Sequence, residues 1–185
     1  MTEGLVHTTK VERKKYMNSV TLVKKMGLLV LACALLPVVA TARPEPASGG
    51  FFPCFNYAGL PRQVGENVIV TFNISGSSTG TFTSTSVVGT EMDVIHRDGS
   101  ITLHGSFLFT GSVNGGPEGT MLFTYEGIGN LMNGHETLHF VGRQGTGGLA
   151  GVHANLTAEG DVGGSSPGCD VSGAGTYAGQ VVFAP

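Results

Sequence analysis

Residues 135–139, with the sequence HETLH, have the H-E-x-x-H spacing of zinc proteases. In that motif, two histidines four residues apart lie on one face of a helix and bind one zinc ion, and the glutamate activates the attacking water. Here Gly134 and Gly142 leave barely two helical turns, and the residues between them favour a strand. In a strand the histidines stand roughly 13 Å apart. Gly145 also replaces the third histidine of the extended motif, so a zinc metalloprotease is only our third interpretation.

A different metal site can be assembled from neighbouring strands. His104, Glu126 and His139 share the polar parity of three predicted strands, and they converge if that face of the sheet points inward. The alternative is that they belong to the solvated face of a half-buried sheet. We expect no cofactor and no resident metal ion, and we keep this trio as the alternative.

Four residues have side chains suited to proton transfer in an isomerase or cyclase, namely Tyr125, Tyr177, Glu126 and His139. They follow no signature spacing, and both tyrosines also suit a packed core. No glycine cluster leads from a strand into a helix, so the sequence contains no phosphate loop, dinucleotide fingerprint or nucleophile elbow. Catalysis is therefore an alternative to our first expectation.

Short segments of alternating polarity, separated by glycine-rich turns, must position these residues. We predict eight strands, at residues 67–75, 80–88, 90–96, 101–110, 121–126, 137–140, 152–158 and 176–184. Asp98-Gly99 is a strong hairpin signal, and no window shows a helical stripe. Many short antiparallel strands without crossover helices indicate an all-β fold, and glycines within the strands favour a closed eight-stranded barrel over a sandwich.

The apolar parity of these strands predicts the interior of the barrel. An eight-stranded barrel is just wide enough to be filled by side chains or to hold one small ligand. We therefore expect the interior, and any ligand-binding surface, to be formed by Phe107, Phe109, Met121, Phe123, Leu138 and Phe140.

The first 42 residues have the features of a secretory signal peptide. Lys24 and Lys25 precede an apolar run at 26–40, which is short for a membrane span and ends in a small-x-small cleavage pattern. A lipoprotein signal at Cys33 and an uncleaved anchor are the alternatives. We predict a signal peptide at 1–42, a proline-rich arm at 43–65 and the barrel domain at 66–185, in a protein that is secreted or periplasmic and leaves the membrane after cleavage.

The charge of the chain narrows the choice of partners. Residues 1–42 contain six of the ten Lys and Arg but only two of the thirteen Asp and Glu, so the remainder is acidic. Such a chain cannot neutralise phosphates, and we expect neither nucleic acid nor anionic lipid as a partner.

Cys54 and Cys169 remain after cleavage, and an even pair in an exported protein predicts a disulfide.

Three segments resemble a mainly bacterial domain family of unknown function that is related to the allene oxide cyclase-like barrels. They are RDGS at 97–100, TGSVNGGPEGT at 110–120 and GTGGLAGV at 145–152, and the resemblance extends from about residue 79 to 183. It implies an eight-stranded antiparallel barrel of the calycin type without an established activity. The chain departs from the family at Phe107, where relatives tend to have a glutamate, and at Leu138, where they often have a tryptophan.

Together these features predict an exported barrel that binds a small apolar molecule or has a structural role, without catalysis. The alternative is an isomerase or cyclase of the allene oxide cyclase type, acting on an apolar substrate inside the barrel. That alternative rests on analogy of fold, which does not by itself determine function.

Overall fold

A computed structural model of the chain describes residues 42–184, and all the regular structure in that range is β. No helix in this range is long and apolar enough to cross a membrane. The signal-peptide and Cys33 predictions fall on residues 1–42, which lie outside the described range except for the last of them. The strands are β1 Pro44–Tyr57, β2 Arg62–Val64, β3 Asn67–Gly80, β4 Phe82–Ile95, β5 Ser100–Val113, β6 Gly119–Asn130, β7 His135–Gly147, β8 Val152–Ser166 and β9 Cys169–Phe183.

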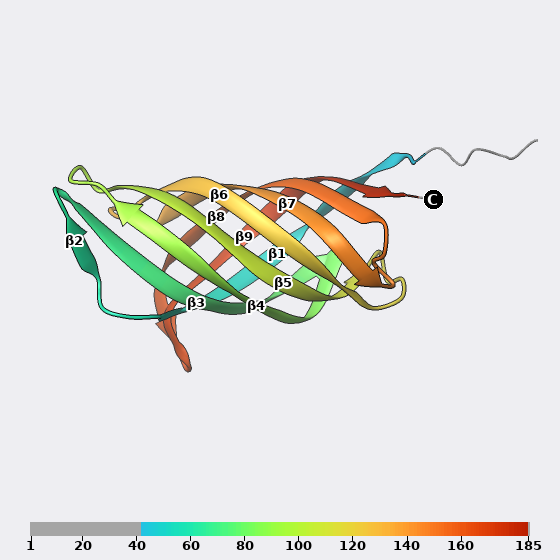
Figure 1. Cartoon of the computed structure of the whole chain (residues 1–185), viewed down its shortest axis with the longest axis horizontal. Coiled ribbons are helices and arrows are strands. Elements are labelled where there is room, and N and C mark those ends of the chain that lie inside the picture. Colours follow the sequence, from blue (N-terminus) through green and yellow to red (C-terminus); the bar gives the residue numbers. More distant parts are fainter. Residues whose placement is uncertain (1–41, 185) are drawn as a thin grey trace, which may run out of the picture. The chain divides into compact units, whose positions relative to one another are not determined.

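Eight of these strands form a closed antiparallel barrel. From β3 to β9 each strand pairs with the next one in sequence, and β1 closes the ring by pairing with both β9 and β3. The short strand β2 pairs with β3 beyond the point where β1 leaves it. Figure 1 shows β1, in cyan, running beside the red β9 in a ring of steeply tilted strands. The predicted eight-stranded antiparallel barrel is confirmed.

The proline-rich arm predicted at 43–65 is wrong for most of its length, because residues 44–57 form β1. Pro44 and Pro46 lie where β1 pairs only with β9, and Pro53 lies where the β1–β9 ladder is interrupted. Proline has no amide hydrogen to donate, so in sheets it is confined to such positions. The strand also contributes to the core through Ala47 and Phe55, which are buried.

Two strands predicted at 80–88 and 90–96 are a single strand, β4. Gly89 lies in its middle, and a Cβ at this position would overlap the Ser106 carbonyl oxygen of β5. The glycine therefore permits a close approach of two strands and does not mark a turn. The predicted number of barrel strands is nevertheless right. One strand is lost because these two merge, and one is gained because the predicted arm forms β1.

The predicted interior parity is confirmed by burial. Phe109, Met121, Phe123 and Leu138 are buried, and Phe107 and Phe140 face the same interior and pack against the buried core. One aromatic group anchors this core: Phe82 packs edge to face against Phe109, Phe123 and Tyr177, with ring centroids 5.8, 5.6 and 6.1 Å apart. Such edge-to-face pairs stabilise a core beyond the area they bury.

The predicted disulfide between Cys54 and Cys169 is present and joins β1 to β9, with a Cα–Cα distance of 5.3 Å and a sequence separation of 115. Two further bonds hold the same strands together. The Tyr57 amide donates to Asp170 Oδ2 at 3.0 Å, and the Asp170 amide donates to Asn56 Oδ1 at 3.2 Å. On the chain-entropy argument, a cross-link over so long a loop contributes about 5 kcal/mol to stability.

The glycine string at 145–152 forms the turn between β7 and β8. Gly147 and Gly151 adopt φ values of 58° and 75°, which disfavour residues with a Cβ. Leu149, between them, is almost completely buried in the core, and its amide donates to the Thr146 carbonyl at 3.0 Å. The segment with the clearest family resemblance is therefore a structural turn that places an apolar side chain in the core.

Candidate functional site

The HETLH segment is the start of β7, so its residues alternate between the two faces of the barrel wall. Glu136 faces the interior and is 8% exposed. Both histidines face outward, where His135 Nδ1 lies 3.0 Å from Asp161 Oδ1 and His139 Nε2 lies 2.8 Å from Asn155 Oδ1. The histidines and the glutamate of a zinc protease must face one metal ion. Here they point to opposite sides of a strand, so the arrangement is not that of the protease.

The trio His104, Glu126 and His139 is brought together, but on the outer face. Glu126 lies directly opposite His104 on β5 and opposite His139 on β7, which makes a row across three strands. The condition for a metal site was that this face point inward, and it does not. Within residues 42–184, no group of three His, Cys, Asp or Glu is arranged to hold a metal ion.

The two tyrosines proposed as proton donors face inward, in different surroundings. The Tyr177 hydroxyl accepts a hydrogen bond from the Phe82 amide and donates one to the Thr79 carbonyl, both at 2.9 Å. These two hydrogen bonds fix the backbone on either side of the β3–β4 turn. The Tyr125 hydroxyl donates to Glu91 Oε2 at 2.5 Å. Of the four proton-transfer candidates, only Tyr125 contacts a buried acid in the described part of the chain.

Three buried carboxyl groups lie in the interior, and they are not among the site residues predicted from the sequence. Glu91 and Asp93 on β4 and Glu136 on β7 are 4%, 7% and 8% exposed. Charged residues are almost never buried this deeply unless they are paired. The available signal was parity, because Glu91 and Asp93 alternate in phase with Ile95, which packs against the core.

Glycines on β5 and β6 make room for this cluster. Gly105 lies opposite both Glu91 and Tyr125, and a Cβ on it would come within 2.5 Å of Tyr125 Cζ. Gly129 lies opposite Glu136, and a Cβ there would be 3.0 Å from Glu136 Cγ. Because β5 has no side chain at 105, Tyr125 can cross it to reach Glu91 on the next strand.

Burial controls the ionisation of the cluster. It raises the pKa of Glu136 to about 7, with a further increase from the charge of Asp93 and a decrease from His135. Burial also raises the pKa of Glu91, and the charge of Asp93 adds to this effect. It raises the pKa of Asp93 as well, against opposing effects of Glu91 and His104. Near neutral pH the cluster therefore retains protons that ordinary carboxyl groups would have lost.

Residues 42–184 place no Lys or Arg in the interior as a counter-charge for these acids. The four arginines of the described residues, at positions 43, 62, 97 and 143, are all exposed, and no lysine occurs in this range. Asp93 Oδ1 is buried and has no hydrogen-bond partner among the described residues. The cluster can therefore bind a cation or a hydrogen-bond donor, which the described protein atoms do not supply.

Two adjoining cavities reach the cluster. The inner cavity measures about 100 Å³ and includes five of the six predicted interior residues, Met121 being the exception; the lining also includes Tyr125 and Val87. The second cavity measures about 780 Å³ and lies at the barrel end near the β6–β7 turn; its lining includes Glu91, Asp93 and Glu136. We call the inner cavity the chamber and the second cavity the mouth. Phe55 and Glu136 line both, so the acids lie where the apolar chamber meets the wider mouth.

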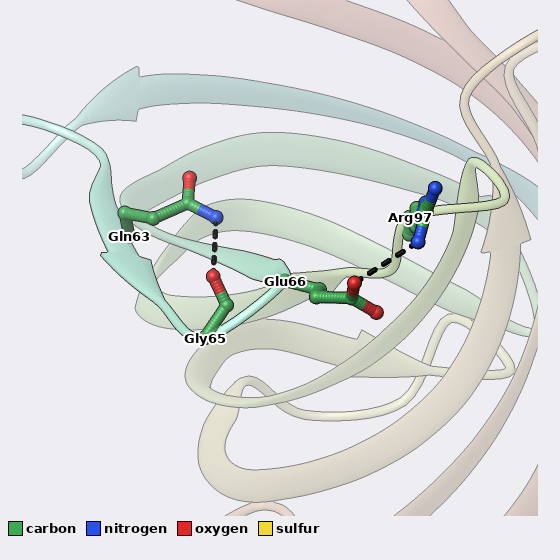
Figure 2. A network of polar contacts seen from close by, with 4 residues as sticks. All are labelled: Gln63, Gly65, Glu66 and Arg97. Carbon is green, nitrogen blue, oxygen red and sulfur yellow. Dashed lines mark hydrogen bonds and ion pairs between the residues drawn. The ribbon is translucent and has the colours of Figure 1, made fainter.

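An exposed polar network connects two turns at the same end of the barrel (Figure 2). Arg97 Nη1 lies 3.0 Å from Glu66 Oε1, and Gln63 Nε2 donates to the Gly65 carbonyl at 2.8 Å. The arginine and glutamate side chains are 79% and 73% exposed, and a pair of this kind contributes about 0–1 kcal/mol. The network links the β2–β3 turn to the β4–β5 turn, and its groups do not contact the cavity acids.

Comparison with known proteins supports the fold. No protein-family model and no curated protein matches the sequence. Among solved structures, the chain is similar to a protein of unknown function from the DUF3224 family of Shewanella oneidensis MR-1. The TM-score is 0.59 at 16% sequence identity, and the match covers 77% of this chain and 99% of the other. At this identity the similarity shows a shared barrel fold, and the relation to the allene oxide cyclase-like group stays a prediction.

Proposed function

We propose that the barrel binds a small, largely apolar molecule, which enters through the wide mouth and places its apolar end in the inner chamber. The observation that carries the proposal is the junction of the two cavities at Phe55 and Glu136. Ligand sites commonly measure about 300–1,000 Å³ and combine apolar walls with a few polar groups. The mouth is of this size, whereas the inner chamber alone is too small for more than part of a ligand.

The aromatic residues of the chamber support the proposal. Phe107 stacks on Phe123 with a centroid distance of 5.1 Å, and Tyr125 lies 5.0 Å from Phe140. Phe107 and Phe140 face inward but are only partly buried, and both line the cavity. They therefore offer aromatic surface to a molecule inside the barrel.

A bulky side chain in the chamber is expected to exclude such a molecule. In Val87→Trp an indole would enter the chamber, so we expect the Kd for the neutral fluorophore Prodan to rise at least about tenfold, because the volume available to the ligand is lost. The measurement is the blue shift of Prodan emission on titration with the protein.

The neighbouring residue provides a matched control. Val88 points outward and is 61% exposed, so Val88→Trp adds the same indole without entering the barrel and should leave the Kd unchanged. Circular dichroism establishes that both variants fold. The proposal fails if the wild-type protein does not shift Prodan emission, or if both variants bind it as the wild type does.

We keep an isomerase or cyclase acting on an apolar substrate as a second candidate, because Tyr125 contacts Glu91 at 2.5 Å beside the chamber. With its raised pKa, Glu91 carries a proton at neutral pH and can donate it to a carbonyl oxygen while an ionised neighbour removes an α-hydrogen. The test follows deuterium uptake by 4-phenylbutan-2-one in D2O by NMR. Catalysis predicts uptake faster than in buffer and slower in Glu91→Gln, and uptake at the buffer rate rejects this candidate.

A further inference from the structure

We propose that the carboxyl cluster binds the ammonium group of an apolar amine whose hydrocarbon part occupies the barrel. The inference rests on the proposed function, since it identifies the polar end of the same ligand. Its structural basis is the position of Glu91, Asp93 and Glu136 on the lining of the mouth cavity, next to the apolar chamber.

Asp93 carries a buried acceptor that an ammonium group can satisfy. Its side chain is more than nine-tenths buried, it lines the mouth cavity, and no atom in the described part of the chain hydrogen-bonds to its Oδ1. A buried acceptor without a partner is costly, whereas a charge-assisted bond from an ammonium group is among the stronger hydrogen bonds. A ligand that carries N–H donors therefore supplies what this oxygen lacks.

The charge of the cluster also favours an ammonium group. Carboxyl groups occupy buried positions 91 and 93 on β4 and buried position 136 on β7. Each arginine in the described range is exposed. Proton uptake is the way in which the unliganded cluster limits its negative charge. An ammonium group in the same place provides the counter-charge directly, and a carboxylate ligand would be repelled.

Aromatic residues form part of the wall beside the acids. Phe55, Phe72 and Tyr57 line the mouth cavity together with Glu91 and Asp93. Phe72 packs against both Phe55 and Tyr57, with ring centroids 5.6 and 5.0 Å apart. Ring faces attract organic cations, so the wall and the acids favour the same end of a ligand. A bare metal ion would use the acids but gain nothing from the apolar chamber.

The titratable groups around the cluster set the pH dependence of binding. Glu91 and Asp93 belong to β4, Tyr125 to β6, Glu136 to β7, Tyr57 to β1 and Asp170 to β9, and all of them line one of the two cavities. From β3, β5 and β8 the lining is apolar or small: Val68, Val70, Phe72, Ile101, Val162, Gly163, Gly164 and Ser165. His104 and His135 influence the acids from outside the wall. The ammonium group enters already protonated, and a carboxyl proton leaves to the buffer.

The test uses three ligands that share one hydrocarbon part: 4-phenylbutylamine, 4-phenylbutan-1-ol and 4-phenylbutyrate. Isothermal titration of the whole protein near neutral pH should give a Kd for the amine at least about tenfold below that of the alcohol, with the carboxylate weakest. Repeating the amine titration in buffers of different ionisation enthalpy should show release of up to about one proton per amine bound. A role of the acids in structure alone predicts no proton release.

Variants separate this inference from the proposed function. In Asp93→Asn and in Glu136→Gln, the advantage of the amine over the alcohol should largely disappear while the alcohol still binds, and Glu159→Gln on the outer face should preserve it. If Prodan binds and the amine binds no more tightly than the alcohol, the ammonium inference is wrong and the proposed function stands. If none of the three ligands nor Prodan binds, both are wrong.

Discussion

Raising the pH from 5 to 9 is expected to lower the free energy of unfolding, with Glu136 alone accounting for about 3 kcal/mol. Burial raises the pKa of this carboxyl from 4.5 to about 7, so the folded protein binds more protons than the unfolded chain between these values. Stability from this group is therefore fully present below pH 4.5 and is lost as the pH rises through about 7. Glu91 and Asp93 act in the same direction, since burial raises the pKa of both.

The measurement is urea unfolding followed by far-UV circular dichroism at several pH values. Glu136→Gln removes the titrating group, so its stability should depend less on pH, by about 3 kcal/mol over the same range, and above pH 8 it should exceed that of the wild type. Glu159→Gln removes an exposed carboxyl from β8 and should leave the wild-type pH dependence intact. A wild-type protein equally stable at both ends of the range would contradict the buried ionisation.

Truncation of the central aromatic group is the second large expected effect. Phe82→Ala should lower the free energy of unfolding by about 4 kcal/mol, because Phe→Ala changes in a core cost about 3–5 kcal/mol through lost burial and the remaining cavity. Phe82 is 3% exposed and packs against three other rings from β5, β6 and β9. Loss of its ring therefore weakens contacts across the barrel as well as within one strand pair.

Phe52→Ala provides the matched control for this prediction. Phe52 lies on β1 and is 48% exposed, so removal of its ring should change stability by less than about 1 kcal/mol. Both variants are compared with the wild type by urea unfolding at acidic pH, where the carboxyl cluster is neutral. Equal losses in the two variants would show that the Phe82 group does not anchor the core.

The carboxyl cluster and the aromatic core have opposite effects on the barrel. The rings around Phe82 stabilise it, whereas Glu91, Asp93 and Glu136 destabilise it at neutral pH because their ionised forms are poorly solvated in the interior. Buried groups that reduce stability are characteristic of functional sites. This opposition is the main physical reason for placing the site at the mouth of the barrel and not on its outer face.

The prediction of an eight-stranded barrel, with its interior parity and its disulfide, came from local patterns. Alternation identifies which residues share a face, and the Phe107–Phe109 and Met121–Phe123 positions are apolar enough to mark that face as buried. The Cys54–Cys169 pair followed from the number of cysteines outside the first 42 residues.

The mistakes came where a local signal had two meanings. Prolines in residues 44–57 indicated an irregular arm, but each is placed where no ladder hydrogen bond is needed. Gly89 indicated a turn, but it permits a close contact between two strands. The HETLH spelling also had two meanings, and there the predicted strand is confirmed, because β7 directs its glutamate inward and its histidines outward.

The sequence by itself determined that the strands have one apolar and one polar face, because a period of two is a property of each segment. Only the tertiary structure decided which acids meet. Glu136 is more than forty residues from Glu91 and Asp93 along the chain, and the three come together because closure of the ring places β4 and β7 around one interior. Glycines at 105 and 129 then leave the space in which these groups, Tyr125 and a ligand can lie.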